Sequence, residues 1–387
     1  MGGATAHQAG RPAAPPPRRR RAQAPMMLLA ALALLAGLWA GLNRLGWAIP
    51  PLPGAITANH GPLMVNGFLG TVICLERAVA LGRNLGRRRY LIAPALSAAS
   101  GAMLLVSAPP LLPRVLAVLA ALALVGIFIT IYRLQPGTDA AVMGLAAALW
   151  LGGNLLWLGG SPIPRVVPWW AAFLILTIAG ERLELARVLL VGKGAWQTFI
   201  AAVGVTLAGL LLSLALPDAG IRLAGVGLVA LGLWLLRFDV ARRTIRREGL
   251  TRFIAACLLP GYVWLVVGGA LWAYYGAAYS AGPIYDALLH TLFLGFVMSM
   301  IFGHAPVIIP SVMGVKVPYT PAFYAHLILL HVSLAVRVAG DLIPSLAARR
   351  WGGLFNEVAL LLFLAVTVIA ARRGRAKAPA APRGAQR

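Results

Sequence analysis

Five of the chain's six histidines lie in apolar sequence long enough to cross a bilayer. One stands near the start of an early apolar run, and four more are close together between positions 283 and 341: His60, His290, His304, His326 and His331. An imidazole in hydrocarbon is unfavourable unless it has a partner, so these residues mark candidate functional sites. Neutral imidazoles are ligands for haem iron, copper and zinc, and this is the chemistry that the five suggest.

Helix geometry places these histidines at two depths. His60 and His290 enter spans that run in the same direction, roughly 8 Å below the same edge at ~1.5 Å per residue. His304 follows His290 on one helix face, roughly 21 Å deeper, and His326 enters the next span at the depth of His304. His331 lies near mid-membrane. The sequence therefore predicts an outer metal or haem site at His60 and His290, and an inner site at His304 and His326 with His331 between the levels.

Two other interpretations of these polar residues stay open. Each histidine could instead donate to a carbonyl or hydroxyl group of a neighbouring helix. Arg337 lies at the level of the outer pair, where a bound haem would need cations for its propionates. Its alternative is a salt bridge to Asp341 or Glu357, and Arg349 and Arg350 are alternative propionate partners. Two buried asparagines are expected to join helices by hydrogen bonds: Asn66 and Asn154.

Composition sets the protein class in which these sites must be built. Hydrophobic residues make up 60% of the chain and charged residues 11%, and the mean hydropathy is +0.84. These values indicate an all-α, polytopic integral membrane protein. The net charge of +24 comes from arginines in the tails and loops, so no nucleic-acid partner is expected. Cys74 and Cys257 lie in apolar runs without a C-x-x-C partner, which excludes a disulfide framework.

The apolar runs predict about twelve transmembrane helices between two tails. Residues 1–25 and 372–387 are basic and rich in Pro and Ala, and both are expected to be disordered. The transmembrane domain covers 26–371, and its first run is retained because no small-residue cleavage site follows it. The expected spans are 26–42, 55–81, 91–107, 112–133, 139–159, 167–190, 196–216, 221–237, 253–275, 284–309, 321–340 and 353–371.

A weak internal repeat relates the second, sixth and tenth spans. The second ends L-E-R-A-V-A-L-G-R, the sixth ends G-E-R-L-E-L-A-R, and the tenth ends F-G-H-A-P. These endings are separated by about four spans each, which is compatible with a 4+4+4 pseudo-repeat. The Glu-Arg pairs stand at helix ends, where interfacial ion pairs are expected.

The histidine-bearing spans resemble a known family. N-H-G-P-L-M-V-N-G-F in the second span and H-T-L-F-L-G-F-V-M-S-M-I-F-G-H in the tenth resemble the NnrS family. Those bacterial inner-membrane proteins are linked to nitric oxide stress and carry haem and copper. The plan is also similar to the large subunit of haem–copper oxidases, whose second and tenth helices supply the histidines of the low-spin haem. His60 and His290 match those positions.

The resemblance implies a haem b protein, with copper as a further cofactor, in a nitric oxide response or respiratory-type role. The H-x-x-x-Y and His-His elements of the oxidases are missing from the sixth and seventh spans, so oxygen reduction is not expected. The rival interpretation is a secondary transporter or permease whose histidines form a proton or substrate path. Whether the protein is an enzyme, a sensor or a transporter stays open at this point, as does its oligomeric state.

Loop charge predicts the orientation in a bacterial inner membrane. The connections that follow even-numbered spans carry most of the basic residues, and both tails lie on the same side: Arg83, Arg87, Arg88, Arg89, Arg133, Arg187, Lys193, Arg242, Arg243, Arg246, Arg247, Arg252 and Lys316. The positive-inside rule then places both termini in the cytoplasm. A fusion of alkaline phosphatase to the C-terminus should therefore be inactive, because that enzyme works only outside the cytoplasm. An active C-terminal fusion would show that the orientation is reversed.

Overall fold

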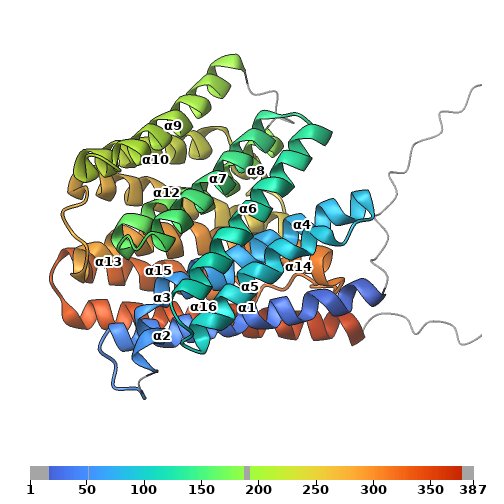
Figure 1. Ribbon diagram of the computed structural model, residues 1–387, viewed down its shortest axis with the longest axis horizontal. Helices are drawn as coiled ribbons and strands as arrows, with labels where there is room; N and C mark the ends of the chain where they lie inside the picture. Colours follow the sequence, from blue (N-terminus) through green and yellow to red (C-terminus); the bar gives the residue numbers. More distant parts are fainter. Residues whose placement is uncertain (1–16, 51, 187–191, 377–387) are drawn as a thin grey trace, which may run out of the picture.

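The computed structural model describes residues 17–50, 52–186 and 192–376, and every regular element in this part of the chain is helical (Figure 1). Eleven of its helices are long and apolar enough to cross a membrane, and one further apolar helix, Arg89–Leu105, is shorter. Each of the twelve expected spans corresponds to one of these helices. The expected all-α, multi-pass membrane architecture is confirmed.

The elements of the first half are α1 (Pro17–Arg44), α2 (Gly54–Ala58), α3 (His60–Pro62), η1 (Leu63–Gly70), α4 (Thr71–Leu85), η2 (Arg89–Leu91), α5 (Ile92–Leu105), α6 (Leu111–Leu134), α7 (Thr138–Leu158) and α8 (Ile163–Ala186). Those of the second half are α9 (Lys193–Leu212), α10 (Pro217–Phe238), α11 (Ala241–Thr244), α12 (Gly249–Tyr275), α13 (Gly282–His290), η4 (Thr291–Met298), α14 (Ser299–Met313), α15 (Phe323–Leu342) and α16 (Leu346–Ala376).

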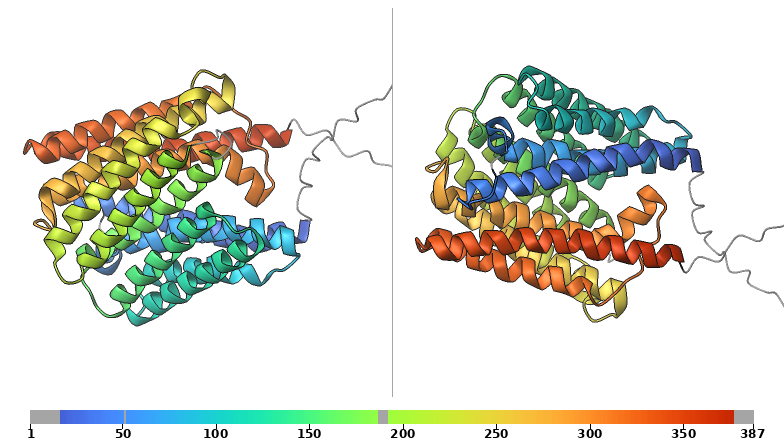
Figure 2. Two further views of the ribbon diagram at one scale, coloured as in Figure 1. Left: turned by 90° about the horizontal axis from the view of Figure 1, so that it is seen from above. Right: turned by 90° about the horizontal axis from the view of Figure 1, so that it is seen from below.

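The first and last helices are longer than their apolar runs. Helix α1 begins at Pro17, so the expectation of disorder over 1–25 is wrong for its last nine residues, and α16 continues to Ala376 through the start of the expected 372–387 tail. The added residues are mostly Arg, Ala and Gln, which favour helix, and Pro17 stands in the first turn, where proline is tolerated. Pro25 lies inside α1. Residues 1–16 and 377–387 lie outside the described residues. Both helices reach the same end of the bundle, where the chain enters and leaves (Figures 1 and 2).

Two of the helical segments are π helices, and each follows an outer histidine. Segment η1 begins three residues after His60, and η4 begins directly after His290. Each is eight residues long with Gly-Phe at its fifth and sixth positions, Gly67-Phe68 and Gly295-Phe296. Most π helices are single turns and many occur at functional sites. The second and tenth spans are therefore built alike, whereas the sixth, α8, is α-helical from Ile163 to Ala186. The 4+4+4 repeat stays a prediction.

Buried asparagines connect helices of the first half of the chain, as expected. The side-chain oxygen of Asn66 in η1 accepts from Nε1 of Trp150 in α7 at 2.9 Å, and its backbone carbonyl accepts from Ser97 in α5 at 2.6 Å. The side-chain oxygen of Asn154 in α7 accepts from Nε1 of Trp170 in α8 at 3.0 Å. These bonds satisfy polar groups that have no access to water in hydrocarbon. The two bonds of Asn66 fix the π segment η1 against α5 and α7, and that of Asn154 joins α7 to α8.

A buried ion pair joins α8 to the end of α10. The guanidinium of Arg182 donates to both carboxylate oxygens of Asp239, at 2.8 and 3.1 Å, and the two side chains are 3% and 0% exposed. The same carboxylate accepts from the backbone N–H of Ala241, which begins α11. A second pair, Arg77 with Glu181, joins α4 to α8. Of the Glu-Arg endings, Arg77 and Glu181 form an ion pair with each other. Arg182 is buried rather than interfacial, and its partner Asp239 was not predicted.

Replacing Arg182 by methionine should lower the free energy of unfolding by about 3–5 kcal/mol, because Asp239 would keep a buried charge without its partner. The matched control is Arg222→Met. Its pair with Asp218 is 43% and 55% exposed, and such pairs contribute about 0.2–1 kcal/mol. Denaturant titration in detergent measures both losses, and the double variant Arg182→Met/Asp239→Asn should recover much of the first. Equal losses in the two single variants would contradict the assignment.

Candidate functional site

A cavity of about 370 Å³ lies between α1, η1, α13, η4, α15 and α16, at the end of the bundle opposite the chain ends. Figure 2 shows α1 and α16 running along the same face of the bundle. The volume lies in the range of small-molecule sites. Charged side chains line one part of the cavity: Arg44, Asp286, Arg337, Arg349 and Glu357. The rest of the wall is mostly apolar: Leu38, Leu45, Met64, Val65, Leu69, Val167, Leu289, Phe293, Leu294, Met298 and Leu360. The cavity thus suits a ligand with one polar edge and an otherwise apolar body.

His60 and His290 line this cavity together. Their ring centroids are 6.5 Å apart and their planes are tilted by 39°. Nδ1 of His60 lies 2.7 Å from the carbonyl of Gly37, and Nδ1 of His290 lies 2.9 Å from the carbonyl of Asp286. A carbonyl only accepts, so each Nδ1 carries the proton and, in the neutral rings, each Nε2 is an acceptor. The Nε2 of His290 already faces a donor, because Nη2 of Arg337 lies 3.4 Å from it. The structure therefore brings the predicted outer pair together in the tautomer that binds a metal through Nε2.

Arg337 is paired with an aspartate that the sequence analysis did not name. Its guanidinium donates to both carboxylate oxygens of Asp286, at 2.7 and 2.9 Å, and not to Asp341 or Glu357. Asp341 lies 3.0 Å from Arg349 instead. The Asp286 carboxylate is also 3.2 Å from Nδ1 of His290, and Nη2 of Arg337 is 3.4 Å from Nε2 of that ring. Asp286 lies four residues before His290, one helical turn away, and this D-x-x-x-H spacing was the available signal.

A glycine of α1 makes room for the cavity beside His60. A Cβ at Gly41 would lie 2.8 Å from Oε1 of Glu357 and 3.5 Å from Cε1 of His60. Within the described residues, Glu357 makes no hydrogen bond or salt bridge, and the same is true of Arg44, which is exposed. The site therefore offers one carboxyl group and one guanidinium that no hydrogen bond or salt bridge of the described segments engages, although Glu357 lies within electrostatic reach of Arg337.

The three inner histidines lie apart from one another. Nδ1 of His304 lies 2.7 Å from the carbonyl of Met300, one turn earlier on its own helix. His331 accepts from Nε1 of Trp264 at 3.1 Å through Nδ1, and its Nε2 lies 3.2 Å from Oγ of Ser299. Across the described ranges, no hydrogen bond or ring contact joins two of these histidines, and no group of three or more His, Cys, Asp or Glu side chains could hold a metal.

His326 has the most unusual surroundings of the three. It is 1% exposed, and neither ring nitrogen has a hydrogen-bond partner. Four phenylalanine rings surround it at centroid distances from 4.6 to 6.0 Å: Phe253, Phe302, Phe323 and Phe363. Three of the four are close to perpendicular to the imidazole, an arrangement in which an N–H can point at an aromatic face. None of the described residues around His326 donates a hydrogen bond to the ring nitrogen that carries the lone pair.

Comparison with known sequences assigns no activity. The model of a family described as a domain of unknown function (DUF8744) matches residues 23–372, which is nearly all of the described chain. No curated protein matches the sequence. The matched range contains all five membrane histidines, so the candidate site lies wholly inside the family's domain.

Replacing His326 by leucine should raise the melting temperature of the purified protein or leave it unchanged. The substitution removes two buried nitrogens that lack hydrogen bonds, and such groups cost about 1–3 kcal/mol each. His304→Leu is the control, because it breaks the bond to Met300 and should be destabilising by about 0.5–1.5 kcal/mol. Metal analysis of the same samples tests the predicted inner site: bound copper or zinc that His326→Leu removes would make His326 a metal ligand.

Proposed function

We propose that this chain, which belongs to the DUF8744 family, binds a haem in the cavity beside η1 and η4, with His60 and His290 as the two axial ligands. One observation carries the proposal, the approach of these two rings to a centroid distance of 6.5 Å, with their planes tilted by 39°. Two nitrogens that each lie about 2 Å from one metal ion are about 4 Å apart, and ring centroids about 1 Å behind them are then about 6 Å apart. The measured spacing fits a single metal between the rings.

The donor set favours haem over an isolated metal ion. A structural zinc site takes four protein ligands, and a catalytic one takes three. The described residues converge on two imidazoles at this point and on no third His, Cys, Asp or Glu ligand. A porphyrin supplies four nitrogens itself, so two histidines complete the coordination of its iron. For the same reason we propose no copper at this site.

The distribution of charge around the cavity also suits haem. The apolar wall would cover the macrocycle, and the charged part would receive its two propionates. Arg44 is suited to this role because no salt bridge holds it within the described segments, whereas Arg349, which lines the same part of the cavity, lies 3.0 Å from Asp341. Arg337 is the less suitable cation, since Asp286 already occupies its guanidinium. Asp286 and Arg337 would instead hold the ring of His290 in place and keep its Nδ1 protonated.

The role that follows is electron transfer or redox sensing in the membrane, of the respiratory or nitric oxide-response type. When bound, haem iron supplies one-electron redox chemistry. Two histidines as axial ligands leave no open coordination position, which favours this role over reduction of oxygen. The proposal includes a site near the outer face of a bacterial inner membrane with both termini in the cytoplasm, an orientation that the basic loops support.

Visible absorption spectra of the protein purified from haem-supplied cells test this assignment. The oxidised and dithionite-reduced spectra should be those of a low-spin haem, and His60→Ala and His290→Ala should each abolish them. His304→Ala is the matched control, because His304 stands in the same span with its Nδ1 on a carbonyl, and it should keep the spectrum. A wild-type protein without a Soret band, or His60→Ala and His290→Ala variants with unchanged spectra, would refute the proposal.

A further inference from the structure

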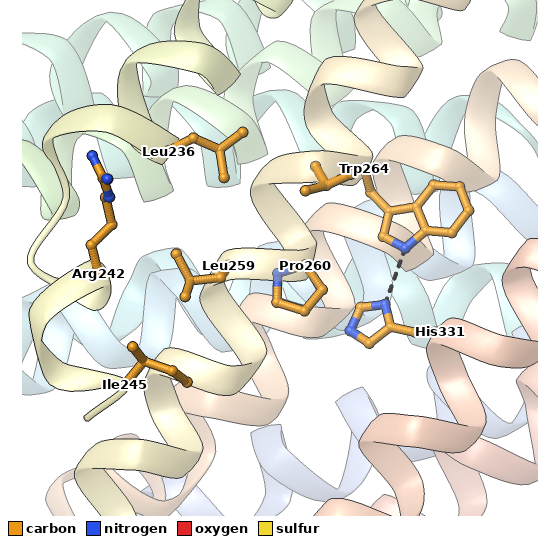
Figure 3. A pocket seen from close by; sticks show the side chains of 8 residues that line it. Leu236, Arg242, Ile245, Leu259, Pro260, Trp264 and His331 are labelled. Carbon is orange, nitrogen blue, oxygen red and sulfur yellow. Dashed lines mark hydrogen bonds between the residues drawn. The ribbon is translucent and has the colours of Figure 1, made fainter. Parts of the chain in front are cut away.

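A second site lies outside the haem cavity and shares no residue with it. It is a groove of about 660 Å³ between the end of α10, α11, α12 and α15. Eight residues line it: Leu236, Arg242, Ile245, Leu259, Pro260, Val263, Trp264 and His331. Figure 3 shows Arg242 at one end, the Trp264–His331 pair at the other, and apolar side chains between them. The groove therefore has one charged end and a long apolar floor.

At the His331 end of the groove, the polar side chains have no free hydrogen-bond donor or acceptor for a ligand. Trp264 donates to Nδ1 of His331, so the ring's proton is on Nε2 and is directed to Oγ of Ser299. Ser299 in turn donates to the carbonyl of Cys257 at 2.7 Å. Each donor in this chain already has an acceptor, and Nδ1 has its donor. What lies in this part of the groove must be hydrocarbon, because a polar group there would stay without a partner.

The end at Arg242 offers a fixed positive charge. The turn between α10 and α11 is held by Asp239, whose carboxylate binds both Arg182 and the N–H of Ala241. Arg242 is exposed and donates Nη1 to the carbonyl of Arg237 at 3.1 Å. No described carboxylate forms a salt bridge with it: Asp239 is bound to Arg182, and the exposed Glu248 makes neither a salt bridge nor a hydrogen bond to it. Four more exposed arginines surround this turn: Arg237, Arg243, Arg246 and Arg247.

We infer that this groove binds an anionic phospholipid of the surrounding membrane. Its phosphate would lie on Arg242, and one acyl chain would follow Leu259, Val263 and Trp264 toward His331. The charge argues for this ligand, because clustered arginines beside a transmembrane helix attract anionic headgroups. The direction in which the groove runs also favours a phospholipid. Its charged end lies at a basic loop, and its apolar end reaches His331 in the middle of a span. This inference is independent of the haem proposal.

Native mass spectrometry of the purified full chain tests the inference, with phosphatidylglycerol and phosphatidylcholine of identical acyl chains as the probes. The wild type should retain phosphatidylglycerol preferentially. Arg242→Gln should lower that retention at least about fivefold, as expected for one interfacial arginine, and Arg242→Lys should retain most of it. Arg246→Gln is the matched control, because Arg246 belongs to the same loop and does not line the groove.

A second variant tests the apolar part. Val263 is 49% exposed in the groove, and Val263→Trp should fill it and lower retention of both lipids while the elution profile of the protein stays the same. Equal losses in Arg242→Gln and Arg246→Gln would show a diffuse basic surface and overturn the specific site. Equal retention of the two lipids by the wild type would overturn the role of Arg242.

Discussion

One constraint shapes the whole structure: a polar group inside a bilayer has no water to bond, so its hydrogen-bond partner must come from the protein. At His60 and His290 this rule sets the tautomer, because a backbone carbonyl accepts a hydrogen bond from each Nδ1–H and each Nε2 is then the acceptor nitrogen of the ring. The carbonyl of Gly37 belongs to the neighbouring α1, and that of Asp286 to the helix of His290 itself. Two different structural solutions thus give the same tautomer on both rings.

The same rule accounts for the distribution of charge. Arg182 and Arg337 each bind one aspartate with two hydrogen bonds across a helix interface. Such pairs satisfy the buried arginines and leave them unable to hold a ligand strongly. Arg44 in the cavity and Arg242 on the groove stand near helix ends and make no salt bridge in the described segments, whereas Glu357, also without a salt bridge, lies inside α16. The ligand sites are therefore defined by the charges that the fold does not neutralise.

Much of this was predictable because a helix has a fixed rise. Counting residues from the edges of the apolar runs placed His60 and His290 at one depth, and their rings do lie together. The rotation of each helix about its own axis was harder to predict. Arg337 pairs with Asp286 rather than with Asp341 or Glu357, and this depends on which face α13 turns toward α15. The separation of the inner histidines and the phenylalanine rings around His326 depend on packing in the same way. The π segments, which alter helical phase, have no sequence signal that was recognised in advance.

These π segments have a consequence for how the domain can change over time. A π turn contains one residue more than an α turn, so it shifts the angular position of every residue that precedes it relative to those that follow. Loss of one residue from η1 would turn His60 by about 100° and take its ring away from His290. Length changes in these two segments are consequently coupled to the shared site, whereas insertions in the loops are not. Within a lineage that keeps the site, the lengths of η1 and η4 should be among its most constant features.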